Sequence, residues 1–280
     1  MYRKEGNSLD YLKNQYIMVE IFQNTIYFLG CLLLIGCNSE SQEWNDLIVD
    51  DSLEGWHGFQ NKNSTRGWVV EDNVLIFSGI SDMESGEGDA SLLSNKIYGN
   101  FEIQFDWKII EGGNSGFMWG VQEDDKYKYP YQTGQEIQIL DSAIYENPEI
   151  ALGGDIEIQN AIEDLKARKH FVGALYDLSP PTNLNAAKPA GHWNSYHIKI
   201  DYEANLGEVT LNKVLINSFR LKGAEWQAML QESKFSKSEA YPYLGDARWY
   251  DFGKFEKGRI CFQDHPGRVS FRNIRIRELE

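Results

Sequence analysis

The stretch Glu136-Ile137-Gln138-Ile139-Leu140-Asp141 places two carboxylic acids and an amide on what its alternation predicts to be a buried β-strand. Successive side chains of a regular strand face opposite ways, so Glu136 and Gln138 share a face and Asp141 points away. A β-bulge at Ile139-Leu140 would add one residue and return Asp141 to the side of Glu136. We therefore expect three polar groups in a row on one concave surface. The plain alternative is a solvated edge strand that carries ordinary acids.

Alternation of apolar and polar residues with period two runs through the rest of the chain and predicts strands. It marks a strand at 101–109, hairpins with turns at 72–73 and 204–207, and a bulge at Arg272-Asn273. Helical spacing is confined to a short segment, 224–232. Many short strands of this kind predict an all-β sandwich of two antiparallel sheets around one core.

The segment from Ala143 to Asp164 has few apolar residues in register and several acids. We interpret it as a long loop over one face of the sheet, where functional groups tend to collect.

The N-terminal part of the chain contains an apolar run at 26–35, roughly half the length that spans a bilayer. The run leads to Leu34-Ile35-Gly36-Cys37 and then a polar stretch, which resembles a lipoprotein signal peptidase site. We expect a signal peptide at 1–36 with translation from Met1 or Met18, a lipidated Cys37, a tether at 37–43 and one domain at 44–280. Such a protein is anchored by lipid in the cell envelope and faces the periplasm or the outer membrane.

The chain has a formal net charge of −15 and three cysteines. This acidity argues against nucleic acid and anionic lipid as partners, since both bind Lys and Arg, but it suits neutral sugars. Cys261 alternates with apolar neighbours and is predicted to be a core residue. The spacing of the Cys and His residues does not match a metal site, and nothing in the sequence requires a cofactor. Carboxylate and carbonyl oxygens could still bind a divalent cation such as calcium.

Several separated motifs together resemble one family, the 3-keto-disaccharide hydrolase domain family, from about Trp44 to Leu279. They are Gly113-Asn-Ser-Gly-Phe117, Glu136-Ile-Gln-Ile-Leu-Asp141, Gly173-Ala-Leu-Tyr-Asp177, Gly191-His-Trp-Asn194, Ser233-Lys-Phe235, Gly258-Arg-Ile-Cys-Phe-Gln-Asp-His265 and Phe271-Arg-Asn-Ile274. The resemblance implies a concanavalin-like jelly roll and an exported glycoside-degrading enzyme, often a lipoprotein. The chain departs from many members at Met118-Trp119-Gly120, where they carry an arginine, so sugar contacts of that arginine do not carry over.

The polar strand also resembles the E-x-D-x-x-E strand of laminarinases and lichenases, but Gln138 stands in place of the central acid. We therefore expect Glu136 and Asp141 to act on a substrate that carries a ketone at C3. The ketone acidifies the C2 hydrogen, so a carboxylate can remove it as general base while an acid protonates the C1 leaving group. Elimination followed by hydration then amounts to hydrolysis. Direct displacement by two carboxylates remains the alternative.

Other residues are candidates for the same site. His265 precedes the turn Pro266-Gly267 and could act as an acid, or simply fix the turn. Aromatic residues in alternating strands can stack on sugars but are more often core. Two rival functions stay open, a non-catalytic carbohydrate-binding module and a conventional endo-glucanase. The candidate substrate-binding residues are Asn114, Trp119, Gln138, His170, Tyr176, Lys234 and Gln263.

Overall fold

The computed structural model describes residues 43–79, 89–141 and 168–280, which lie in one unit that extends from Glu43 to Glu280. The predicted signal peptide at 1–36, the lipidation site at Cys37 and the loop at 143–164 fall outside the described residues. None of the helices that the structure describes is long and apolar enough to cross a membrane.

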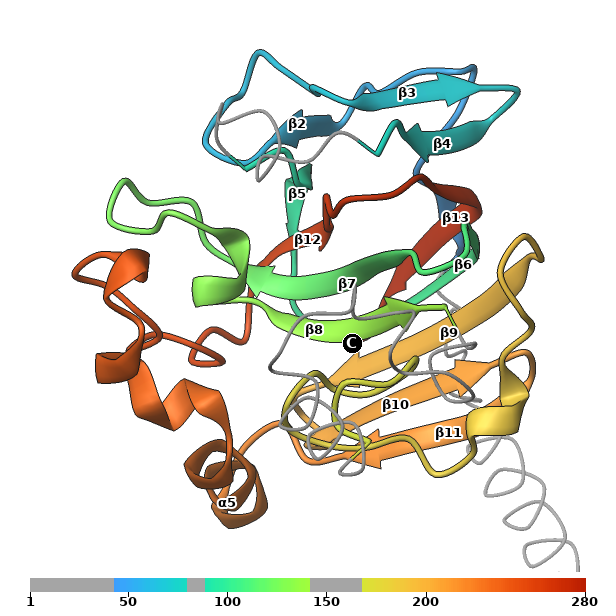
Figure 1. The fold of residues 1–280 in the computed structure, drawn as a ribbon. Helices are drawn as coiled ribbons and strands as arrows, with labels where there is room; N and C mark the ends of the chain where they lie inside the picture. The colour runs from blue at the N-terminus through green and yellow to red at the C-terminus, as the bar shows by residue number, and fades with distance from the viewer. Residues whose placement is uncertain (1–42, 80–88, 142–167) are drawn as a thin grey trace, which may run out of the picture. The chain divides into compact units, whose positions relative to one another are not determined.

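The larger of the two antiparallel sheets has eight strands (Figure 1). Seven of them follow one another, and the short strand β1 (Asn45–Asp46) pairs separately with β13. The order is β11 (Val214–Phe219), β10 (Leu206–Leu211), β9 (Asn194–Asp201), β6 (Phe101–Ile109), β13 (Val269–Glu278), β4 (Val74–Phe77) and β3 (Trp68–Glu71).

The smaller sheet has five strands and ends at β8, its edge strand. The order is β2 (Trp56–Gly58), β5 (Leu92–Tyr98), β12 (Gly258–Phe262), β7 (Asn114–Val121) and β8 (Gln135–Leu140). The described helical segments are η1 (Pro130–Gln132), η3 (Leu184–Ala186), α5 (Ala224–Glu232), η4 (Lys234–Ala240) and η5 (Pro242–Leu244).

The core lies between the sheets and is built by the alternation seen in the sequence. In β6 every second residue from Phe101 to Ile109 is buried. Its central Phe105 meets Phe117 of β7 and Phe262 of β12, with ring centroids 5.6 and 5.4 Å apart. Each such ring contributes about 1.5 to 3 kcal/mol on full burial, so this cluster fastens one sheet to the other. The predicted two-sheet sandwich is confirmed.

Most local predictions also agree with the structure. The helix α5 covers 224–232 as expected, and the first hairpin turns at 72–73. The second hairpin turns at 202–205, two residues before the predicted 204–207, because Leu206 already pairs with Asp201. In β13 the pairing with β6 shifts between Arg272 and Arg275, and Asn273 has φ 52°. This left-handed residue is the extra one of the predicted bulge.

The segment after β11 packs beside β7 and β8, as its orange ribbon shows in Figure 1. Gln132 in η1 fastens it, because its Nε2 donates to the carbonyls of Leu244 and Arg248 at 3.1 and 2.8 Å. The backbone N–H of Gly253 donates to Thr133 at 3.0 Å. These bonds hold the segment, which carries η4, against the turn that leads into β8.

Candidate active site

The outer face of the five-stranded sheet carries polar side chains in neighbouring cross-strand rows. Strand β8 turns Ile137 and Ile139 into the core, which leaves Glu136 and Gln138 on the outer face. Gly116 of β7 lies opposite Gln138, and its carbonyl accepts from the backbone N–H of Gln263 at 3.0 Å. The sheet therefore brings polar residues of β7, β8 and the end of β12 together.

A pocket of about 500 Å³ opens over these rows. One part of its wall is polar and comes from β7, β8 and the residues just after β12. Another part is aromatic and comes mainly from η1 and from the segment after α5. The polar residues are Asn114, Glu136, Gln138, Gln263, Asp264 and His265, and the aromatic residues are Tyr129, Tyr131, Tyr176, Phe235, Tyr243, Trp249 and Phe252. Lys234 and Asp89 line it as well.

Glu136 is a buried acid in this pocket, with 8% of its surface exposed. Burial raises its pKa from the ordinary 4.5 to about 7, although the Lys234 ammonium acts in the opposite direction. With its nitrogen turned towards acceptors, the Gln138 amide donates to Glu136 Oε1 and to the Ser115 carbonyl, both at 3.2 Å. A carboxylate with a pKa near neutrality is well suited to act as general base.

Lys234 and Tyr176 bound the pocket beside Glu136. The backbone N–H of Tyr176 donates to the Glu136 carbonyl at 2.9 Å, which places the two residues side by side. The Lys234 Nζ lies 4.2 Å from the centroid of the Tyr176 ring, a distance at which an ammonium is attracted to an aromatic face. The pocket therefore holds a cation close to its buried acid.

His265 and Asn114 lie together at the polar wall. Asn114 Nδ2 donates to His265 Nε2 at 3.3 Å. Burial lowers the pKa of His265, opposed by the Pro266 backbone and by Asp264, so the ring is neutral at neutral pH. The Asn114 Oδ1 is buried and has no hydrogen-bonding partner among the described residues. This oxygen could accept a hydrogen bond from a ligand hydroxyl.

The predicted three-residue row does not form, because the bulge at Ile139-Leu140 is wrong. Strand β8 pairs with β7 in unbroken register from Gln135 to Leu140, and the Asp141 N–H continues the pairing to the Gly113 carbonyl at 3.1 Å. With no extra residue in the strand, Asp141 lies away from Glu136.

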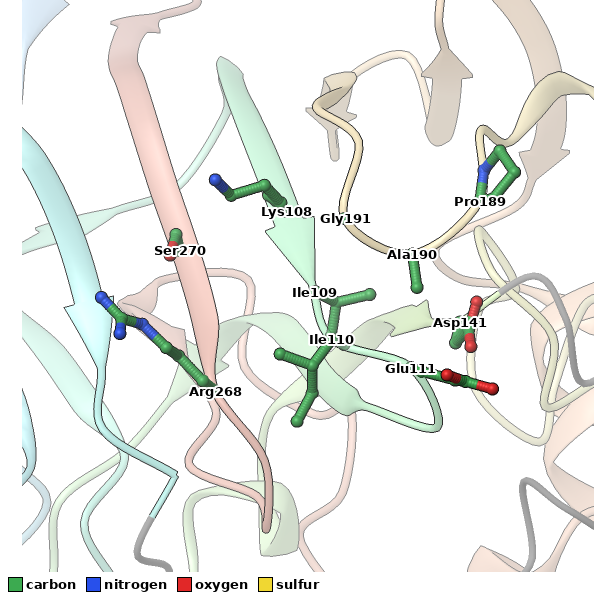
Figure 2. A pocket seen from close by; sticks show the side chains of 10 residues that line it. All are labelled: Lys108, Ile109, Ile110, Glu111, Asp141, Pro189, Ala190, Gly191, Arg268 and Ser270. Carbon is green, nitrogen blue, oxygen red and sulfur yellow. The ribbon is translucent and has the colours of Figure 1, made fainter.

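Asp141 instead lines a separate hollow of about 640 Å³, where Figure 2 shows it beside Ala190 and Glu111. Its Oδ2 accepts from the Gly112 backbone N–H at 2.9 Å. This contact fastens the turn between β6 and β7, and it gives Asp141 a structural role.

Asp141→Asn is therefore expected to keep turnover within about threefold of the unchanged protein, since the amide oxygen can still accept from Gly112. Asp141→Ala should lower the free energy of unfolding by about 1 to 3 kcal/mol through the lost hydrogen bond. Parallel rate measurements and urea titrations check both. A loss of 100-fold or more in Asp141→Asn at unchanged stability would return Asp141 to the chemistry.

Two other residues that the sequence predicts to bind substrate lie outside the pocket. Trp119 is 1% exposed and faces the core, where its Nε1 donates to the Tyr202 hydroxyl at 3.2 Å. Alternation in β7 places it there, which contradicts its predicted contact with sugar. His170 does not line the pocket among the described residues; it stacks on Tyr176 with centroids 4.6 Å apart. Asn114, Gln138, Tyr176, Lys234, Gln263 and His265 do come together with Glu136.

The aromatic wall of the pocket is not among the features predicted from the sequence. Tyr129 and Tyr131 stack with their rings 5.0 Å apart and 7° from parallel, while Trp249 belongs to a segment far along the chain. The Tyr-x-Tyr spacing just ahead of β8 is a sequence signal for Tyr129 and Tyr131. The other aromatic residues reach the pocket through the tertiary packing of the segment after α5, which no local pattern indicates. In the part of the chain that the structure describes, no three His, Cys, Asp or Glu residues gather as a metal site.

Comparison with known proteins supports an enzymatic site. Residues 43–277 match the model of the 3-keto-alpha-glucoside-1,2-lyase-like domain. The chain belongs to this family. A 3-keto-disaccharide hydrolase of Bacteroides thetaiotaomicron is 30% identical over 241 residues, which is 82% of this chain and 76% of the relative. The family expected from the motifs is thus confirmed, and the chain is a hydrolase.

Solved structures agree with this assignment. A Parabacteroides distasonis protein described as a glycosyl hydrolase superposes with a TM-score of 0.67 and 29% identity, over 85% of this chain and 94% of that protein. A second glycosyl hydrolase structure from the same organism gives a TM-score of 0.53 at 22% identity, over 85% and 100%. The second likeness concerns the fold alone. Together they place the family on a two-sheet jelly roll.

Proposed function

We propose that this member of the 3-keto-alpha-glucoside-1,2-lyase-like family cleaves 3-keto-glycosides in the pocket above β8, with Glu136 as the general base. The observation that carries the proposal is a buried Glu136 with a pKa of about 7 beside the Lys234 ammonium. Asp141, the partner expected for a two-carboxylate displacement, lies in another hollow. This separation favours proton transfer over direct displacement.

The proposed reaction uses the acidity that the C3 ketone gives to C2. Glu136 takes the C2 proton, and the electron pair of that bond moves into an enolate whose oxygen lies towards Lys234. The enolate re-forms the ketone and expels the C1 substituent, which leaves a C1–C2 double bond conjugated with the carbonyl. The departing C1 oxygen takes up a proton from solvent. Water then adds at C1 and gives up a proton to solvent, and protonated Glu136, after exchanging its proton with solvent, returns a proton to C2. The sum is hydrolysis of the glycosidic bond.

The walls of the pocket suit such a substrate. Asn114, Gln263 and neutral His265 supply hydrogen bonds at the polar wall for sugar hydroxyls. The aromatic wall, which includes the stacked Tyr129 and Tyr131, supplies faces on which a ring can stack. We therefore assign carbohydrate as the substrate class.

Product analysis with a 3-keto-glucoside and its unoxidised parent, side by side, tests this proposal. We expect release of the C1 substituent from the ketone alone. Cleavage of the parent at a similar rate would favour a conventional endo-glucanase. Binding of either compound without cleavage would favour a carbohydrate-binding module.

We also propose that the protein acts at the cell envelope, anchored through a lipid on Cys37. The support is the apolar run that ends at Leu34-Ile35-Gly36-Cys37. Cys37→Ser should release the protein from the membrane fraction into the soluble exported fraction, measured by fractionation and immunoblotting. Unchanged retention would show that another feature holds it there.

A further inference from the structure

A short segment of the chain crosses the free edge of β8 and carries Tyr176 to the pocket. Gly173 N–H donates to the Gln138 carbonyl at 2.9 Å, and Gln138 N–H donates to Ala174 at 3.0 Å. With the bond from Tyr176 to Glu136, the segment pairs with β8 almost as another strand. Asp177 follows directly and has a left-handed backbone, with φ 60°.

Asp177 holds two different parts of the protein with its two carboxylate oxygens. Oδ1 lies 2.9 Å from His170 Nε2, and Oδ2 accepts from the backbone N–H of Lys234 at 2.6 Å. Burial raises the pKa of Asp177, but the hydrogen bonds from His170 and Lys234 outweigh it and leave the pKa lowered. Asp177 is therefore charged and bridges the β8 crossing to the start of η4.

The two residues held by Asp177 each place a side chain against the ring of Tyr176. His170 stacks on it at 4.6 Å and 23°, and Lys234 Nζ lies 4.2 Å from its centroid. The Lys234 N–H belongs to the first residue of η4, a position whose N–H has no partner within its own helix. Asp177 thus fixes where η4 begins, and with it where the Lys234 side chain starts.

We propose that Asp177 is a positioning residue, which holds the Lys234 backbone and the His170 ring so that the Lys234 ammonium stays against Tyr176 and beside Glu136. Its catalytic meaning rests on the proposed function, in which Lys234 faces the enolate oxygen. The positioning effect can be measured without substrate, because the position of the Lys234 ammonium also affects the pKa of Glu136.

This arrangement predicts that replacing Asp177 raises the pKa of Glu136, which is opposite to the usual effect of removing a negative charge. Removing a negative charge near an acid ordinarily makes that acid ionise more easily, so simple loss of the Asp177 charge would lower the pKa of Glu136. If Asp177 acts by holding Lys234, the ammonium drifts away in Asp177→Ala, which removes both acceptor oxygens, and the pKa of Glu136 rises instead. Among the described residues, the other titratable groups that line the pocket with Glu136 are Asp89, Asp264, His265, Tyr129, Tyr131, Tyr176 and Tyr243. The buried thiol of Cys261 also interacts with Glu136, and the substitution leaves all of these groups in place.

The test follows the titration of Glu136 by NMR, in protein labelled with ¹³C at the glutamate carboxyl. The signal that is lost in Glu136→Gln assigns the residue, and no substrate is present. We expect the midpoint to rise by roughly half a pH unit or more in Asp177→Ala, and in Lys234→Met. In a Lys234→Met background, Asp177→Ala should add no further rise. Asp106→Ala is the matched control, since Asp106 accepts from Arg272 and Asn273 at 3.1 and 2.9 Å away from this pocket.

An unchanged or lowered midpoint in Asp177→Ala would overturn the proposal, as would an equal rise in the Lys234→Met background. If Asp177→Ala fails to fold, Asp177→Glu gives the same decision, because it keeps the charge but displaces both hydrogen bonds. Failure of the proposed function would appear separately, as absence of cleavage of a 3-keto-glucoside by a protein whose Glu136 midpoint still responds to Asp177.

Discussion

Glu136→Gln should lower turnover of a 3-keto-glucoside by roughly 10²- to 10⁴-fold, the usual contribution of a general acid–base group. The amide keeps the shape of the side chain and one acceptor, so substrate binding should persist. In deuterated water the unchanged protein should place deuterium at C2 of the released sugar. Mass spectrometry of the product and steady-state rates measure both. Glu102→Gln is a matched control, because Glu102 is also buried but contacts His197 and Arg277 on the other sheet.

The same residue should set the pH dependence of the reaction. A base must be deprotonated, and burial raises the pKa of Glu136 to about 7, so the rate should fall as the pH drops below about 7. Product without label at C2, or full activity in Glu136→Gln, would contradict proton transfer by Glu136 and favour direct displacement.

The stability of the fold should respond to pH in the opposite direction. Because the folded pKa of Glu136 lies above the ordinary 4.5, the charged form destabilises the fold, and stability is lost as pH rises from about 4.5 through 7. The difference corresponds to roughly 3 kcal/mol. Glu136→Gln should remove this loss, so the variant gains relative stability at pH 8 and little at pH 4.

Gly116→Ala should cost about 100-fold in turnover while the protein stays folded. A Cβ at Gly116 would lie 2.0 Å from Glu136 Oε1 and 2.6 Å from its carboxyl carbon, so the carboxylate must move aside. A displacement of about 1 Å can cost roughly 10²-fold in an oriented reaction. Rate measurements with thermal unfolding as a check on folding give the answer.

Gly99→Ala is the control for this prediction. Its added Cβ would meet Lys257 Cγ at 3.2 Å, the middle of a flexible side chain that can give way. Activity within about twofold is expected there. Equal activity in Gly116→Ala would mean that the carboxylate does not need its present position.

The fold was predictable from the sequence because the alternation is strict where strands face the core. The alternation of apolar and polar residues around Phe105 predicts that its side chain points into the core. The same alternation shifts by one residue at Asn273, which indicates the bulge that the structure has there. Asp141 was misplaced for a related reason. A bulge can be read only where apolar residues on both sides fall out of phase, and after Leu140 the apolar pattern ends, so the expected extra residue had no independent support.

The site was predictable in part. Glu136 and Gln138 were found because two polar groups on the same face of an apolar strand need an explanation. The link from Asp177 to Lys234 joins residues 57 positions apart in the sequence, and the Trp249 wall depends on how the segment after α5 packs against η1. Such contacts arise from tertiary packing, which local periodicity does not encode.

The crossing at 173–176 has a consequence for solubility. Strand β8 reads Gln-Glu-Ile-Gln-Ile-Leu and lies at the edge of its sheet. An open edge with that composition would recruit strands from other copies of the protein and promote aggregation. The backbone bonds from Gly173, Ala174 and Tyr176 occupy this edge. The enzyme can thus keep a strongly β-forming strand at the border of its sheet without offering it to neighbouring molecules.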